Sequence, residues 1–208
     1  LGKGIVVTKK DTKIPLPKVK TGKPITVQSE PTDDVRDYIQ SLVARAEAFK
    51  GGRVKPNEDN MLKITNDGRH VALDPRLRVP GASDSPGSKI NQCVEQVKDV
   101  YDRTAKDKGT QIIWCDLSTP GKGWSIYDEL KQKLIDAGIP ERQIAFIHDA
   151  KDEKQQATLY DRMNRGDLRV IIASTEKMGT GANVQRRLKA AHHLTAPWRP
   201  ADIEQRVV

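Results

Sequence analysis

The hydrophobic pattern divides the chain into an N-terminal part with helical spacing and a C-terminal part with short apolar runs. In the C-terminal part, these runs predict buried strands over residues 111–115, 144–148, 168–174 and 190–196. The intervening segments predict helices over residues 125–137, 153–165 and 200–206. Strands that alternate with crossover helices predict an α/β fold with a parallel sheet flanked by helices.

The N-terminal part predicts helices, with one segment left ambiguous. Apolar residues recur at helical spacing from Thr32, a predicted N-cap, to the glycines at 51–52. Residues 57–79 fit a hairpin with an Asn66-Asp67-Gly68 turn, and they also fit a helix interrupted by Gly68. Ser88 is the predicted cap of a further amphipathic helix that runs towards Gly109.

Prolines and glycines indicate where the chain is divided. Residues 1–31 carry four prolines among lysines, which predicts an extended connector, with a short strand at 25–27 as an alternative. Residues 79–88 are rich in Gly, Pro and Ser and predict a linker with a domain boundary. We therefore predict a connector at 1–31, helices and a linker at 32–88, and an α/β lobe at 89–208.

The charge balance favours a polyanionic partner. The formal net charge is +8 and the pI is about 9.4, and lysines crowd the first segment. Clustered lysines and arginines bind phosphates and release counterions, although a solvated basic surface has the same composition. Aromatic residues make up only 4% of the chain, which disfavours a stacking platform for single-stranded nucleic acid.

The cysteines and the hydropathy indicate a cytoplasmic protein. Cys93 and Cys115 fall in a predicted helix and a predicted buried strand, so we expect reduced core thiols. No stretch approaches the roughly 20 apolar residues of a membrane span, and the N-terminus lacks the apolar length of a signal peptide. We therefore expect no membrane partner.

Polar residues gather where the predicted strands end, and in a parallel sheet these ends share one edge. They are Asp116, Ser118, Thr119, His148, Asp149, Ser174, Thr175, Lys177, Trp198 and Arg199. Hydroxyls, a lysine and exposed amides suit phosphate binding without demanding base identity. Any one of these residues alone is ordinary loop chemistry, because Ser and Thr after a strand more often serve as turn or cap residues. For Trp198 we predict a packing role.

These segments resemble the motifs of a known enzyme superfamily. STEKMGTGANVQ followed by HHLTAPWRPADIEQR resembles motifs V and VI of superfamily-two helicases and translocases, and QIIWCDLSTP resembles motif IV. The closer resemblance is to the chromatin-remodeller-like branch, in particular to large helicase and DNA-methylase proteins of bacterial phages and mobile elements. Residues 57–79 are helical in that branch, which favours the helix over the hairpin.

The resemblance implies a C-terminal RecA-like lobe that contributes to an ATP-dependent DNA motor. The implied DNA-backbone contacts are Ser118, Thr119, His148, Ser174, Thr175 and Lys177. The implied ATP-binding residues are Gly179, Thr180, Gly181, Asn183, Gln205 and Arg206. The implied partners are duplex DNA, a first RecA-like lobe that holds most of the ATP and Mg²⁺, and a fused or associated DNA methylase.

The sequence also departs from the family pattern. Motif VI runs Gln-Arg-x-Gly-Arg-x-x-Arg, but Val207-Val208 follow Gln205-Arg206, so no arginine finger is present. The chain also lacks G-x-x-x-x-G-K-S/T and a Walker B acidic box. It therefore contains no complete catalytic site. We therefore expect part of a longer motor that does not hydrolyse ATP alone.

Other functions remain as alternatives. One is a non-catalytic nucleic-acid-binding module with a degenerate helicase lobe. A small-molecule enzyme of the Rossmann type is disfavoured, because the chain lacks G-x-G-x-x-G. A metal site is not expected, because His192-His193 lacks a cysteine or carboxylate partner at zinc-like spacing.

Overall fold

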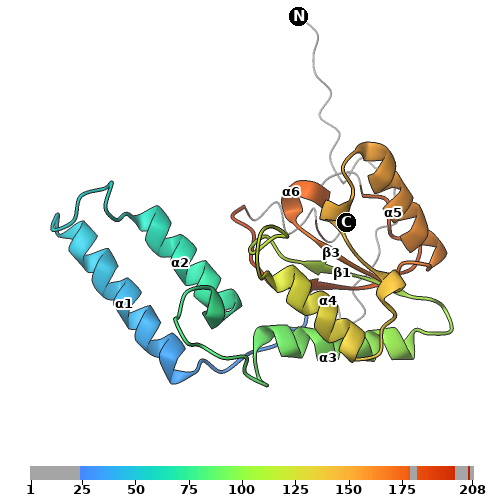
Figure 1. Cartoon of the computed structure of the whole chain (residues 1–208), viewed down its shortest axis with the longest axis horizontal. Coiled ribbons are helices and arrows are strands. Elements are labelled where there is room, and N and C mark those ends of the chain that lie inside the picture. The colour runs from blue at the N-terminus through green and yellow to red at the C-terminus, as the bar shows by residue number, and fades with distance from the viewer. Residues whose placement is uncertain (1–23, 179–181, 200–205, 207–208) are drawn as a thin grey trace, which may run out of the picture.

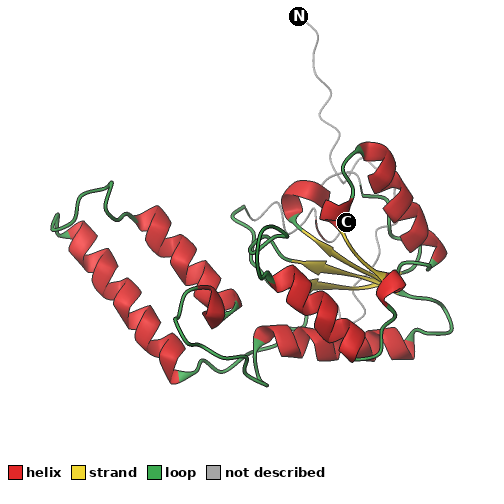
Figure 2. Ribbon diagram, in the orientation of Figure 1, coloured by secondary structure: helices red, strands yellow, loops and turns green. Residues whose placement is uncertain are grey.

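The computed structural model describes residues 24–178, 182–199 and 206. Figure 1 and Figure 2 show an α/β unit with a pair of helices, α1 and α2, standing to one side of it. The predicted domain boundary at 79–88 falls between these two parts and stays a prediction.

The sheet that the described residues form is entirely parallel. Its strands lie in the order β2-β3-β1-β4. They are β1 (Thr110–Trp114), β2 (Ile144–Phe146), β3 (Val170–Ala173) and β4 (Leu188–His193). Ile113 of β1 pairs with Ile172 of β3 on one side and with His192 of β4 on the other. The predicted α/β fold with a helix-flanked parallel sheet is confirmed, with strand bounds that differ from the predicted ones by a few residues.

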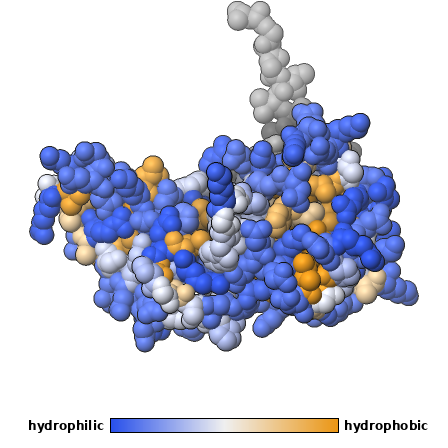
Figure 3. Space-filling model, viewed as in Figure 1, coloured by the Kyte–Doolittle hydropathy of each residue, from blue (hydrophilic) through white to orange (hydrophobic). Residues whose placement is uncertain are grey.

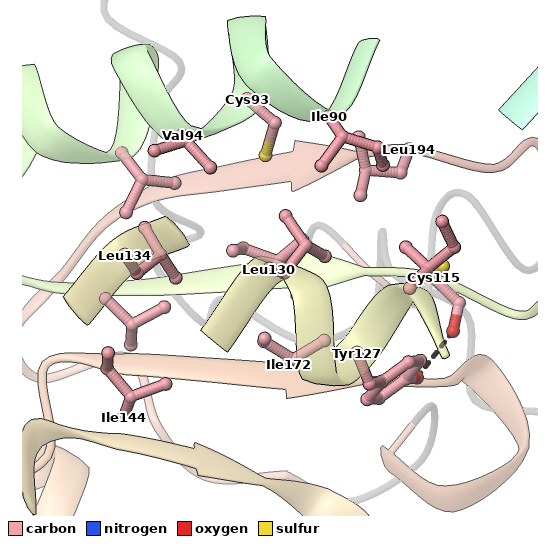
Figure 4. Close-up of a cluster of buried hydrophobic side chains, with 14 of the residues drawn as sticks. Ile90, Cys93, Val94, Cys115, Tyr127, Leu130, Leu134, Ile144, Ile172 and Leu194 are labelled. Carbon is pink, nitrogen blue, oxygen red and sulfur yellow. Dashed lines mark hydrogen bonds between the residues drawn. The ribbon is translucent and has the colours of Figure 1, made fainter. Parts of the chain in front are cut away.

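Helices cover both faces of the sheet. Side chains alternate across each strand, so Ile113 packs on one face while Ile112 and Trp114 pack on the other. The first face is covered by α3 (Lys89–Arg103) and α4 (Ile126–Asp136), whose buried side chains appear in Figure 4. The second face is covered by α5 (Glu153–Arg165) and the short α6 (Thr175–Met178). Burial on both faces explains the apolar character of β1, β2 and β3, whose residues are all buried. The residues of β4 instead alternate between half-buried and exposed.

Local sequence signals fix several helix ends. The side chains of Ser88, Ser125 and Asp152 accept backbone amide hydrogen bonds at the N-termini of α3, α4 and α5. Gly166 ends α5 with a left-handed φ of 78°, where a Cβ atom would lie 2.6 Å from Lys108 Cβ. The predicted Ser88 cap is confirmed, and α4 and α5 begin within one residue of their predicted starts. The other predicted cap, Thr32, precedes α1 but makes no side-chain cap hydrogen bond.

The paired helices are α1 (Asp33–Lys50) and α2 (Met61–Leu73). Helix α2 confirms the helical alternative for this segment, and the Asp-Gly hairpin is wrong. Gly68 sits inside the helix, where a Cβ atom would lie 3.5 Å from Leu42 Cδ1. Arg45 of α1 then clamps the pair, because its guanidinium bonds Asp59 at 2.7 Å and Asp67 at 2.9 Å. Tertiary packing therefore outweighs the local turn signal of Asp67-Gly68.

The segment at 25–27 forms no strand in the structure. Ile25 and Val27 are 79% and 52% exposed, so they lack the burial that would stabilise a strand. Residues 1–23 of the predicted connector lie outside the described residues.

The segment after α2 is tied to the α/β unit by charged groups. After the turn η1 (Pro75–Leu77), residues 79–88 form turns and bends, as a linker is expected to. Arg76 bonds Asp74 at 2.7 Å and Glu129 of α4 at 2.9 Å. Lys133 of α4 also bonds Asp84 at 2.6 Å. These partly buried ion pairs hold the linker against α4.

Both cysteines lie in the core of the α/β unit. Cys93 and Cys115 are free and buried, and burial raises the pKa of each to about 12. The face drawn in Figure 3 is mainly hydrophilic with separate apolar patches. In the part of the chain that the structure describes, no helix combines the length and apolarity needed to span a membrane.

Candidate phosphate-binding edge of the sheet

The parallel strands bring four loop segments to one edge, which we call the carboxyl edge. Residues 115–119 follow β1, the turn η3 (Ile147–Asp149) follows β2, residues 174–177 follow β3, and residues 194–199 follow β4. The predicted DNA contacts fall on the first three segments. The predicted gathering of polar residues at strand ends is therefore seen in the sheet topology.

Asp116 joins three of these segments. Its carboxylate Oδ1 accepts hydrogen bonds from the Thr175 amide at 2.8 Å and from the Thr175 hydroxyl at 2.9 Å. Its own amide donates to Thr195 Oγ1 at 3.0 Å. Asp116, which follows β1, thus connects the segments after β3 and β4. The sequence places Asp116 at a strand end, but no local pattern indicates this bridging role.

Arg206 completes the network from a distant part of the chain. Its guanidinium pairs with the Asp116 carboxylate, donates from Nε to Thr175 Oγ1 at 2.8 Å, and donates from Nη1 to the Thr195 carbonyl at 2.8 Å. The guanidinium also lies 5.3 Å from the centre of the Trp114 ring. The Arg206 side chain is 0% exposed, so protein groups surround the whole cation.

Ser174 follows β3 directly, and Thr175 is the first residue of the short helix α6. Ser174 is only 5% exposed, and its Oγ accepts the Lys177 amide at 3.4 Å. The same Oγ lies 3.4 Å from His148 Nε2, so the ends of β2 and β3 meet here. Lys177 itself is exposed. The segment therefore presents a cation to solvent while its hydroxyls bond within the protein.

His148 is half-buried at the end of β2. Its ring packs edge-on against Tyr127, with centroids 5.2 Å apart. Burial lowers the pKa of His148, and the nearby Lys177 ammonium lowers it further. The lowered pKa favours the neutral imidazole, so His148 adds little positive charge to the carboxyl edge.

Ser118 and Thr119 present hydroxyls beside the end of β1. Ser118 has a left-handed φ of 51°, and its Oγ accepts the amide of Ile126 at 3.0 Å. A hydroxyl that accepts one bond still has a proton to donate. Thr119 is exposed. Thr119 is thus at the surface beside the end of β1, and Ser118 is partly exposed next to it.

Only two of the six predicted ATP-binding residues lie in the described part of the chain, and these two are not close together. Gly179, Thr180, Gly181 and Gln205 lie outside the described residues. Asn183 is exposed, and its carbonyl accepts a hydrogen bond from Asn164 at 2.7 Å. Because Asn164 lies at the C-terminal end of α5, this contact places Asn183 towards the amino ends of the strands, away from Arg206.

Asn183 and Arg206, the two predicted ATP-binding residues that the structure describes, do not form an anion site. Arg206 has the required charge, but its donors are directed at Asp116, Thr175 and Thr195. Asn183 carries no charge and faces solvent elsewhere. The fit of ATP and Mg²⁺ to this chain is therefore not supported by these residues, and their nucleotide contacts stay predictions.

The chain is distantly similar to solved structures but matches no known family by sequence. No family model matches the chain, and no curated protein sequence matches it. Among solved structures, the crystal structure of the Pyrococcus furiosus Hef helicase domain is similar, with a TM-score of 0.42 and 14% sequence identity. The match covers 83% of this chain and 32% of that one, so the chain spans about a third of its length.

Proposed function

We propose that this chain is the C-terminal motor lobe of an ATP-dependent DNA helicase or translocase, and that its carboxyl edge binds the DNA backbone. The observation that supports this most is the Asp116 bridge to Thr175 and Thr195. It holds the segments after β1, β3 and β4 together, so that the exposed Lys177 and the Ser118 and Thr119 hydroxyls share one edge.

The chemistry of this edge favours a backbone over bases. An ammonium and hydroxyl donors bind phosphate oxygens, which carry no base information. The net charge of +8 strengthens attraction to any polyanion. Binding is therefore expected to be insensitive to sequence and to weaken steeply as salt rises.

ATP hydrolysis is proposed to depend on a first motor lobe. The 208 residues contain no Walker A lysine and no Walker B acidic box, which position the phosphates and magnesium in such motors. We predict that the purified chain has no ATPase activity of its own. Magnesium-dependent phosphate release by the chain alone, absent from a mock purification, would contradict this.

DNA binding is tested by fluorescence anisotropy with a labelled duplex. The Lys177→Ala variant should bind more weakly than the unmodified chain, and the slope of log affinity against log salt should fall by about one. Lys106 is a matched control, because it is exposed but precedes β1 at the opposite end of the strands. Equal effects of Lys177→Ala and Lys106→Ala would contradict a binding site at the carboxyl edge.

The second candidate is a nucleic-acid-binding module without motor activity. It is favoured by the enclosed Arg206 guanidinium, which leaves no described cation of the predicted ATP site open to an anion. The sequence of the parent gene distinguishes the two functions. A Walker A motif upstream and Gly-Arg-x-x-Arg downstream decide for the motor.

A further inference from the structure

The Thr175 hydroxyl has no hydrogen-bonding capacity left for a phosphate. A hydroxyl has one proton and two lone pairs. The proton is donated to Asp116 Oδ1 at 2.9 Å, and the oxygen accepts from both Nε and Nη2 of Arg206. Thr175, which motif resemblance places among the DNA contacts, is therefore fully bonded inside the protein.

Asp116 and Arg206 are similarly committed to the protein. The Asp116 carboxylate receives the Thr175 amide and hydroxyl on one oxygen and the Arg206 guanidinium on the other. Arg206 also bonds the Thr195 carbonyl. Withdrawing either charge from this enclosed pair would leave its partner uncompensated, which is costly in a buried setting. The three residues therefore act as one unit.

This unit fixes the start of helix α6. The Thr175 amide and hydroxyl are both bonded to Asp116, so the first residue of α6 has a defined position relative to the end of β1. Lys177 follows two residues later in the same short helix and is exposed. The position of its ammonium at the carboxyl edge consequently depends on the bonds that Thr175 makes.

We propose that Asp116 and Arg206 are positioning residues for DNA-backbone binding, and that they act through Thr175, which anchors α6 instead of touching phosphate. This inference rests on the proposed function of the carboxyl edge. In this proposal the exposed Lys177 contacts the phosphate, and Arg206 holds the DNA-binding edge in place without contacting DNA.

The charge of Asp116 makes the proposal sharply testable. If Asp116 influenced DNA only through its charge, removing a carboxylate near the edge would strengthen binding to a polyanion. If Asp116 positions Thr175 and Arg206, removing the charge should weaken binding. In Asp116→Asn an amide replaces the carboxylate that pairs with Arg206, so this ion pair is lost while the side-chain volume is kept.

The experiment measures duplex affinity at low salt for the whole chain. Asp116→Asn is expected to weaken binding on the order of tenfold, as for loss of a charge-assisted hydrogen bond. Glu176→Gln is the matched control, because Glu176 is exposed and lies next to Thr175. It also removes one carboxylate, and it should leave affinity unchanged or slightly stronger. Circular dichroism at the same temperature verifies that each variant is folded.

Further variants separate positioning from simple contact. Arg206→Lys keeps the charge but loses the planar fork, so it should weaken binding, whereas the exposed Arg186→Ala should have a smaller effect. Thr175→Ser should retain affinity and Thr175→Val should lose it. The Thr175→Val loss should largely disappear in the Asp116→Asn background, because both changes break the same unit. If Asp116→Asn does not fold, this role is tested by comparing Thr175→Val with Thr175→Ser and by Arg206→Lys.

The outcomes distinguish this inference from the proposed function. If the chain does not bind the duplex, or if Lys177→Ala has no effect beyond that of Lys106→Ala, the carboxyl edge is not the DNA site and both ideas fail. If Lys177→Ala weakens binding as expected while Asp116→Asn strengthens it as Glu176→Gln does, the proposed function stands and the positioning role is overturned. Additive effects of Thr175→Val and Asp116→Asn would also overturn it.

Discussion

The guanidinium carbon of Arg69 lies 4.4 Å from the centre of the Trp198 ring. Arg69 also donates from Nη2 to the Ala196 carbonyl at 3.0 Å. Helix α2 is thereby attached to the segment after β4, close to Thr195 in the Asp116 network. Trp198 packs on Arg69, yet Trp198 is 59% exposed. Its predicted packing role is therefore a contact with a surface arginine and not with the core.

The Arg69–Trp198 contact should be measurable as a coupling between the two residues. We expect Arg69→Ala and Trp198→Ala to be non-additive by about 0.5–1 kcal/mol in the free energy of unfolding, the range of an exposed cation–π pair. Urea denaturation of both single variants and the double variant gives this value. Trp198→Phe, which keeps a ring, should retain part of the coupling. Strict additivity would mean that the contact contributes nothing.

The Arg76 network should contribute more than an ordinary surface ion pair. Arg76→Met leaves the nearly buried Asp74 without its ion-pair partner, and Glu129 loses two hydrogen bonds. We expect a loss of about 2–3 kcal/mol in unfolding free energy. Arg103 pairs with Asp99 at 3.0 Å on the surface, so Arg103→Met should cost less than about 1 kcal/mol. If urea denaturation gives similar losses for Arg76→Met and Arg103→Met, the burial of the Arg76 ion pairs does not matter for stability.

Gly166 should be intolerant of a side chain. Its left-handed φ of 78° disfavours alanine, and the added Cβ would lie 2.9 Å from the Lys108 carbonyl oxygen. Gly166→Ala is expected to cost about 2 kcal/mol or more, because strain and a steric clash combine. Gly52 has a similar φ of 68° with no atom within 4 Å of the added Cβ. Gly52→Ala therefore isolates the cost of the positive φ without a steric clash. Thermal unfolding should show a clearly smaller loss of stability for Gly52→Ala than for Gly166→Ala.

His192 should make the fold sensitive to mild acid. Burial, aided by the neighbouring His193, lowers the pKa of His192 to about 4, against an unfolded value of about 6.5. The unfolded state binds the proton more readily, so stability is retained above about pH 6.5 and falls as the pH drops towards 4. The His192 contribution to this loss should be about 2 kcal/mol between pH 7 and pH 5.

The His192 contribution is isolated by comparing the chain with a His192→Gln variant. Urea unfolding at both pH values should show a smaller acid loss in the variant, while carboxylates affect both proteins equally. The His192 Nε2 atom lies 2.9 Å from Gln111 Oε1, and glutamine keeps a polar group at this place. An unchanged pH dependence would show that His192 does not titrate in this range.

Local patterns in the sequence predict most of the sheet and its helices. Apolar runs such as 168–174 identify strands, and a cap residue such as Ser88 identifies a helix start, because these signals act over a few residues. The carboxyl-edge location of Ser174 and Lys177 also follows, because parallel strands end on one side. The hairpin alternative at 57–79 needed tertiary contacts to be excluded, since the Arg45 clamp joins residues far apart in sequence.

Local sequence signals identify the residues at the strand ends, but the bonds between these residues depend on how the whole chain folds. Asp116, Thr175 and Arg206 are separated by 59 and 31 positions, so no local pattern relates them. Their shared hydrogen bonds depend on strand order, which places β1 between β3 and β4. A hydroxyl at a strand end looks available in sequence, but hydrogen-bond saturation in the folded chain decides whether it can reach a ligand.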